Sequence, residues 1–183
     1  PASVFELGVP TVRDGLWIVG GFVALAGLNQ VMSALLALLA SLLDSLFGVS
    51  VTVGQNTVVE VVRANPEVAF YLLPVTVLFV APGEELLFRG VVQGRIREFF
   101  SPIPGIIIPS IMFAGVHWFA LSGGSPQGNL VAVGILFIPA LVLGVAYEYS
   151  QNIVVPSLIH GFYNATLFSL LYISIAFAGQ MPQ

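Results

Sequence analysis

Residues 81–90 read Ala-Pro-Gly-Glu-Glu-Leu-Leu-Phe-Arg-Gly and place two adjacent carboxylates and a guanidinium within strongly apolar sequence. An unpaired charge inside a bilayer costs roughly 2.5–3.5 kcal/mol on insertion scales, so these groups need compensation there. Glu85 and Arg89 are spaced i, i+4, so they can neutralise each other on one face of a helix. Glu84 is rotated by about 100° from Glu85 and points elsewhere. It therefore needs a partner from another segment.

The whole chain is as apolar as this segment. Of its 183 residues, 57% are hydrophobic and 8% are charged, whereas a soluble domain carries about 25% charged residues. We therefore expect an all-α polytopic transmembrane helical bundle, a single domain over residues 1–183, in the cell membrane. The chain has no cysteine, which excludes disulfides and thiolate sites. Its 5 basic residues and net charge of −4 argue against nucleic acid as a partner.

The apolar segments predict about six membrane-embedded helices, with Pro82 and Gly83 breaking the path between the second and the third. Residues 44–65 are more polar and predict an extramembrane loop with a short strand or interfacial helix. Asn29 is expected to form an interhelical hydrogen bond. Glu148, between two tyrosines, is expected in the headgroup layer. The predicted helices cover approximately residues 16–43, 67–80, 81–100, 106–121, 129–146 and 153–178.

Further polar groups fall within the later spans. The chain has 2 histidines, His117 and His160, and both are predicted to lie inside the membrane, where a polar side chain favours a functional role. Asn164 follows His160 by four residues and shares its helical face, and Phe113 precedes His117 by the same interval. Three helices would thus each present polar groups to a common site that includes Glu84.

A carboxylate and an imidazole together can hold and deprotonate a water molecule, while a second imidazole and an amide can stabilise an oxyanion. This set predicts peptide or ester hydrolysis without a covalent intermediate and without a required cofactor. A zinc alternative is open, in which Glu84, His117 and His160 bind the metal. Other membrane hydrolase designs fit less well. There is no pair of core aspartates, no His-Glu-x-x-His motif, and a serine–histidine dyad would leave the paired glutamates unexplained.

At these residues the sequence resembles the CPBP family of intramembrane proteases, also called the Abi or type II CAAX protease family, and most of all its Ras-converting enzyme branch. Three motifs appear in the family's order. Residues 84–89 match Glu-Glu-x-x-x-Arg, residues 113–117 match Phe-x-x-x-His, and residues 160–164 match His-x-x-x-Asn. The motif-bearing core covers about 68–172. Residues 1–66, a leading segment, a first span and a loop, lie outside the resemblance.

The resemblance implies that Glu84 is the general base and that His117 shares its water, while His160 and Asn164 form the oxyanion site. Glu85 and Arg89 would orient the helix or contact the substrate, and Phe113 would wall the site. The implied protein is an intramembrane endopeptidase, either glutamate-dependent or a metalloprotease. It would act among membrane lipids on a membrane-anchored or lipidated protein, next to a prenylated C-terminus.

Two other classes of function stay open. The polar cluster could serve only for packing in a non-catalytic scaffold or immunity-type protein, or Glu84 could carry protons in a transporter. Family members commonly have more spans than the six expected here. Because the chain also begins at Pro1, we expect either a fragment of a longer protein or a short variant.

Overall fold

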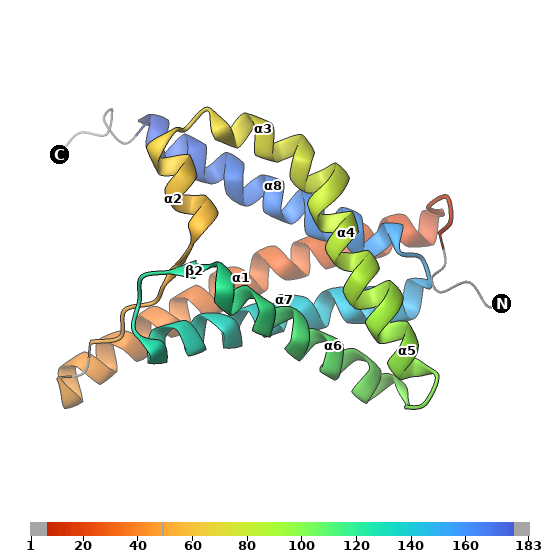
Figure 1. The fold of residues 1–183 in the computed structure, drawn as a ribbon, viewed down its shortest axis with the longest axis horizontal. Coiled ribbons are helices and arrows are strands. Elements are labelled where there is room, and N and C mark those ends of the chain that lie inside the picture. The colour runs from red at the N-terminus through yellow and green to blue at the C-terminus, as the bar shows by residue number, and fades with distance from the viewer. Residues whose placement is uncertain (1–6, 49, 178–183) are drawn as a thin grey trace.

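The structure, a computed structural model, describes residues 7–48 and 50–177. Within those residues, 5 helices are long and apolar enough to cross a membrane: Val12–Phe47, Val68–Arg97, Pro102–Ala120, Pro126–Ser150 and Val154–Phe177 (Figure 1). The predicted all-α polytopic bundle is therefore confirmed, with five candidate spans in the described residues where about six helices were expected.

Shorter elements subdivide or connect these spans. In chain order they are α1 (Val12–Phe47), β1 (Gln55–Asn56), α2 (Thr57–Ala64), α3 (Val68–Val75), η1 (Thr76–Val80), α4 (Ala81–Glu85), η2 (Leu86–Gln93), α5 (Gly94–Arg97), α6 (Pro102–Val116), η3 (His117–Ala120), β2 (Leu121–Ser122), α7 (Pro126–Ser150) and α8 (Val154–Phe177). Residues 44–65 were expected to contain a short strand or an interfacial helix, and they contain both a two-residue strand, β1, and a short helix, α2.

The expected break at Pro82 is absent, which explains the lower number of spans. The elements from α3 to α5 form one continuous helix, seen as a single yellow-to-green rod in Figure 1. Proline removes a backbone donor and crowds the preceding turn. Here the turns before it widen into a π-helix, η1, where the Ala81 N–H bonds to the Thr76 carbonyl. Such local π adjustments allow proline inside membrane helices without a break.

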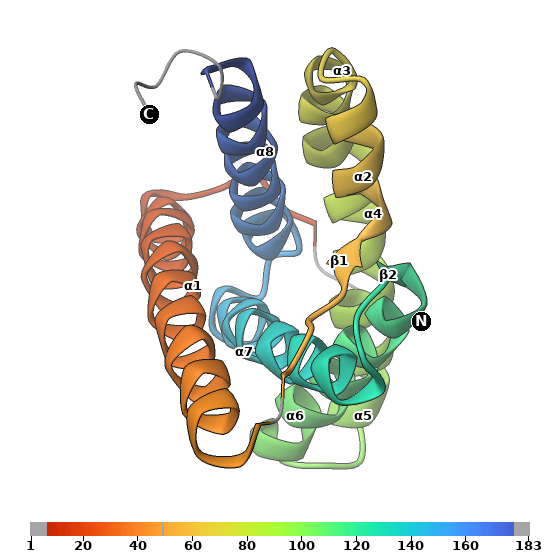
Figure 2. The same cartoon turned by 90° about the vertical axis from the view of Figure 1, so that its left-hand side faces the viewer.

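The five spans form a closed ring. Along it, α1 packs on α7, α7 on α6, α6 on the helix of residues 68–97, that helix on α8, and α8 on α1 (Figure 2). The helices α1, α6 and α8 begin on one side of this ring, where α5 and α7 end (Figure 1). We call this the N-side. The opposite side carries α2 and the β1–β2 pair.

Two apolar clusters hold the ring together. Leu25 of α1 packs with residues of α7 and α8, including Leu143 and Ile159, and all three side chains are buried. Phe88, Phe113 and Ala140 form the second cluster between η2, α6 and α7. The first cluster thus joins α1, α7 and α8, and the second joins the glutamate-bearing helix to α6 and α7.

Candidate active site

One cavity of about 710 Å³ lies among the spans and is lined by polar residues from each of the three motifs. Its walls come from all five spans and from the β1–α2 segment. Most of its lining is aliphatic. The predicted site residues that line it are Glu84, Phe113, His117, His160 and Asn164.

The two adjacent glutamates lie in different surroundings, as their rotation about the helix predicts. The Glu84 side chain is 33% exposed and lines the cavity, whereas the Glu85 side chain is fully buried. Arg89 is also fully buried. Neither Glu85 nor Arg89 is among the residues that line the cavity, so their burial favours the orienting role over the substrate contact that the sequence also allowed.

Arg89 compensates the buried charge of Glu85. Its Nε lies 3.3 Å from Oε2 of Glu85, which is the pair that the i, i+4 spacing predicts. Its Nη2 donates a 3.0 Å hydrogen bond to the carbonyl of Ala140 on α7. The guanidinium carbon lies 5.0 Å from the centroid of the Phe113 ring, within range of a cation–π contact. Arg89 thus ties the glutamate-bearing helix to α6 and α7.

His160 lies between the two carboxylates. Its Nδ1 is 2.9 Å from Oε1 of Glu85, and its Nε2 is 3.8 Å from Oε2 of Glu84. The buried carboxylate paired with Arg89 is a hydrogen-bond acceptor. Nδ1 therefore carries the ring proton and donates a hydrogen bond to Glu85. Nε2 is therefore the nitrogen left for chemistry on the Glu84 side. The His160–Glu85 contact was not expected from the sequence.

His117 is held by its own helix. It is the first residue of η3, and its Nδ1 donates a 2.7 Å hydrogen bond to the carbonyl of Phe113, one turn earlier. Its ring also packs on the Phe113 ring, with centroids 4.6 Å apart. In the neutral ring this leaves a lone pair on Nε2, which can accept a hydrogen bond from water. Because Phe113 and His117 are spaced i, i+4, Phe113 both orients the imidazole and forms part of the cavity wall.

The remaining polar groups of the cavity come from two helices. Asn164 lies one turn beyond His160 on α8, and Tyr163 lies beside it in the wall. Asn29 of α1, which was expected to form an interhelical hydrogen bond, also lines this cavity. The sequence feature that could have indicated a place for Asn29 in the cavity is its polar side chain within an otherwise apolar span.

A strap formed by residues 52–57 contributes Val53 to the cavity wall, together with Asn56 and Thr57. The strap is held by the loop that follows η3. Its Thr52 carbonyl accepts a 2.8 Å hydrogen bond from the Ser125 N–H, and β1 pairs antiparallel with β2. Because β2 begins one residue after η3, the strap is connected directly to the segment that carries His117.

Glu148 lies apart from this cavity and in a different setting from the one expected. Its side chain is 10% exposed and forms a 2.9 Å ion pair with Arg97. It also accepts a 3.2 Å hydrogen bond from Gln93, a buried residue of η2. The carboxylate is therefore turned into the protein rather than into open water, and its predicted depth in the headgroup layer stays a prediction. It clamps α7 to the end of the glutamate-bearing helix.

No metal centre emerges from residues 7–48 and 50–177. No group of three or more His, Cys, Asp or Glu side chains among them is arranged to hold a metal ion. The set of Glu84, His117 and His160 is thus not gathered as a ready metal site. We derive no catalytic step through zinc, and metal analysis is the experiment that tests that alternative.

The chain has recognisable relatives. The sequence model of the family described as "Type II CAAX prenyl endopeptidase Rce1-like" matches residues 66–166, which include every residue of the three motifs. The chain is also similar to a protein of Escherichia coli described as "Uncharacterized 24.3 kDa protein", with 33% identity over 113 residues. That alignment covers 60% of this chain and 47% of the relative, about half its length. No solved structure matches the chain.

Proposed function

The chain belongs to the Rce1-like family of type II CAAX prenyl endopeptidases, and from that premise we propose that it is an intramembrane endopeptidase. It is an integral, multi-pass membrane protein, and the proposed reaction takes place in the cavity among its spans. The proposed substrate is a membrane-anchored protein that is cleaved next to a prenylated C-terminus.

Glu84 and His117 activate the water in this proposal. The water oxygen forms a bond to the scissile carbonyl carbon while Glu84 takes a proton from it. The carbon–nitrogen bond then breaks, and the same proton passes to the leaving nitrogen. The products are a carboxylic acid and an amine, so no oxidant or further reactant is needed. The lone pair that the Phe113 contact leaves on His117 Nε2 suits this ring to orienting the water.

His160 and Asn164 stabilise the oxyanion that develops in the transition state, and donation from His160 Nε2 requires a second ring proton in addition to the one on Nδ1. Glu85 acts through His160 and does not touch the substrate. A buried carboxylate that accepts the second ring N–H holds an imidazole in one orientation, as in other histidine-dependent sites. Its ion pair with Arg89 keeps that carboxylate charged and in place.

The substrate class is supported by the aliphatic side chains of the cavity wall. Leu28 and Met32 of α1, Leu136 of α7 and Leu171 of α8 all line it. An aliphatic lining of this kind suits a prenyl chain, while Glu84, His117 and His160 supply polar groups for the peptide. The family description names a prenyl endopeptidase, which agrees with this substrate class.

One observation carries the proposal: Glu84, His117 and His160 come from three different spans and line one cavity. To test it, the purified protein is incubated in detergent with a prenylated peptide that ends in a CAAX sequence, and the products are identified by mass spectrometry. We expect Glu84→Ala, His117→Ala and His160→Ala each to abolish cleavage. Glu67→Ala, at an exposed position outside the cavity, is the matched control and should retain full activity.

The same assay is repeated with a chelator, alongside metal analysis of the purified protein. The glutamate mechanism predicts unchanged cleavage in chelator and no stoichiometric metal. Full activity in any of the three alanine variants would overturn the role given to that residue. Loss of activity in chelator with recovery on adding zinc would replace the proposed mechanism with the metal alternative.

A further inference from the structure

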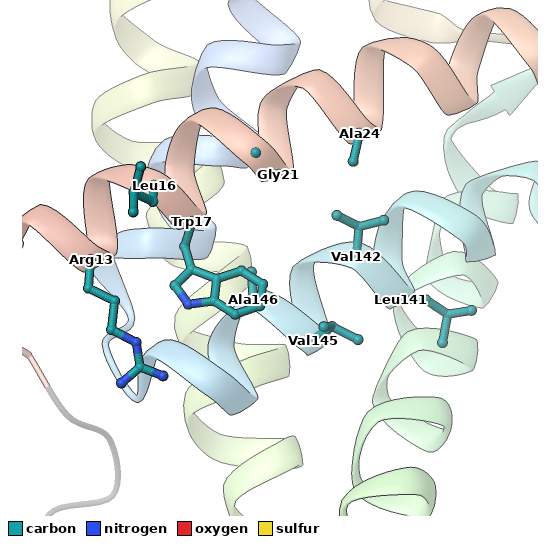
Figure 3. Close-up of a pocket in the computed structure, with 10 residues that line it drawn as sticks. Arg13, Leu16, Trp17, Gly21, Ala24, Leu141, Val142, Val145 and Ala146 are labelled. Atoms are coloured by element: carbon teal, nitrogen blue, oxygen red, sulfur yellow. The ribbon is translucent and has the colours of Figure 1, made fainter.

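A second cavity of about 580 Å³ lies between α1 and α7, away from the candidate active site. Figure 3 shows Arg13 and Trp17 at one end of it and Ala24 towards the other, with Leu141, Val142 and Val145 lying along α7. Gly20 and Gly21 complete the α1 wall. We call this the α1–α7 groove. Its lining is apolar except at the Arg13 end.

The polar end of the groove lies on the N-side, where a membrane–water boundary is expected. The Trp17 and Tyr149 rings are stacked there, with centroids 5.9 Å apart and planes within 5°. Tryptophan and tyrosine concentrate at the headgroup level of membranes. The guanidinium of Arg13 contacts the protein through a 3.4 Å hydrogen bond to the Tyr149 carbonyl. Among the described residues, no carboxylate forms an ion pair with Arg13.

The length of the groove matches one leaflet of a bilayer. Arg13 and Ala24 are eleven residues apart on α1, which is about 16 Å along a helix axis. Half of the hydrocarbon core of a bilayer is about 15 Å thick. An acyl chain that enters from the headgroup level beside Arg13 would therefore follow the groove to the middle of the membrane.

The two adjacent glycines have different surroundings, which defines the open wall of the groove. A Cβ added to Gly21 would collide with the Ile159 side chain, so this glycine lets α1 approach α8. A Cβ added to Gly20 would meet no atom within 4 Å. Gly20 thus leaves unfilled space on the groove side, where a larger side chain could stand without disturbing the packing of the spans.

We propose that the α1–α7 groove binds an anionic phospholipid, with one acyl chain along the groove and the phosphate on Arg13. Charge selects this occupant. An apolar groove that ends in a guanidinium without an ion-pair partner among residues 7–48 and 50–177 fits an amphiphile with a negative head, and Arg is well suited to bind a phosphate through two N–H donors. A second copy of the chain would fill the apolar part but would need to bring a carboxylate to Arg13.

The proposal is tested by lipid binding, a readout that does not depend on proteolysis. The protein is purified in a mild detergent and titrated, in native mass spectrometry, with phosphatidylglycerol and with phosphatidylcholine of the same acyl chains. We expect the first phosphatidylglycerol to bind about fivefold more tightly than the first phosphatidylcholine. Arg13→Gln should remove this preference, and Arg13→Lys should keep most of it. Arg95→Gln, at an exposed arginine outside the groove, is the charge control.

The groove itself is tested by filling it. Gly20→Leu should weaken the binding of both lipids by at least about tenfold, because excluding even two methylene groups costs that much. Gly27→Leu is the matched control, since a Cβ at Gly27 also meets nothing within 4 Å and Gly27 does not line the groove. Gel filtration and circular dichroism establish that each variant is folded.

Four results would overturn the proposal. Equal affinity of the wild-type protein for the two lipids would show that Arg13 does not bind the lipid phosphate. Unchanged binding by Gly20→Leu would show that the acyl chain does not lie in the groove. A change of oligomeric state in Gly20→Leu without loss of lipid would assign the groove to a second copy of the chain. A large excess of inorganic phosphate should leave phosphatidylglycerol bound, and displacement would show that the site recognises phosphate without the acyl chain.

Discussion

His160 Nδ1 lies 2.9 Å from Oε1 of Glu85, a carboxylate with no exposed surface. This contact joins residues 75 positions apart and makes the second of the two glutamates the partner of a histidine in the cavity wall. The pair of glutamates therefore divides into one carboxylate that faces the cavity and one that holds the imidazole. The divided roles lead to different expectations for the two substitutions.

Glu85→Gln should lower kcat by about 10–100-fold and leave KM nearly unchanged. Removing the carboxylate that orients an imidazole typically has an effect of this size, and Glu85 does not reach the cavity where substrate binds. Steady-state kinetics on the prenylated peptide measure both constants. A large rise in KM with unchanged kcat would show that Glu85 contributes to substrate binding.

The same variant should also be less stable, which requires a second measurement. Glu85→Gln leaves Arg89 buried without its carboxylate, and breaking a buried ion pair in this way costs about 3–5 kcal/mol. The double variant Glu85→Gln with Arg89→Met removes the unpaired charge, so we expect part of the stability to return without the activity. Recovery of activity together with stability would mean that Glu85 acts on folding alone.

Glu84→Gln should separate catalysis from folding. We expect cleavage to fall by about 10²–10⁴-fold, the usual contribution of a general base. Because the Glu84 side chain is partly exposed in the cavity, thermal unfolding in detergent should be unchanged or shifted upward. Glu67→Gln is the matched control for both measurements. Unfolding at a clearly lower temperature would favour the scaffold alternative, in which the polar cluster exists for packing.

The position of the strap can be tested at Gly128. A Cβ at this position on α7 would collide with the Thr52 carbonyl, so Gly128→Ala should push the strap away from the loop that holds it. We expect a loss of about 1–3 kcal/mol in the free energy of unfolding, as for other overpacked sites, and a higher KM because Val53 lines the cavity.

Gly134→Ala is the matched control for this prediction. It lies on the same helix, and its Cβ would meet no atom within 4 Å. Its stability and KM should therefore stay close to those of the wild-type protein. Equal effects of the two alanines on KM would show that the strap does not shape the substrate site.

The sequence predicts those parts of the site that depend on spacing within one helix. The Glu85–Arg89 pair, the shared face of His160 and Asn164, and the contact of Phe113 with His117 all follow from i, i+4 relations. The three motifs could be expected to converge because each brings polar groups into a span, where they need partners.

Contacts between helices were harder to predict. Which glutamate faces His160 depends on the rotation and depth of two helices, and neither is encoded in local spacing. The expected break at Pro82 failed for a related reason. A π-helix before the proline satisfies the backbone by a local change in winding, and residue patterns at a period of 3.6 do not reveal such a change.

Glu148 shows the same limit and supports the last prediction. The flanking tyrosines predicted a water-exposed carboxylate, but the Glu148 carboxylate forms an ion pair with Arg97 and accepts a hydrogen bond from Gln93. We expect Glu148→Ala to lower the free energy of unfolding by about 1–3 kcal/mol, because it removes the shielded ion pair with Arg97 and the charged acceptor of the buried Gln93 amide. The exposed Arg95–Glu98 pair is the control, and Glu98→Ala should cost at most about 1 kcal/mol. Chemical denaturation of both variants measures the difference. Equal losses in the free energy of unfolding would show that the Glu148 ion pair contributes no more than an exposed one.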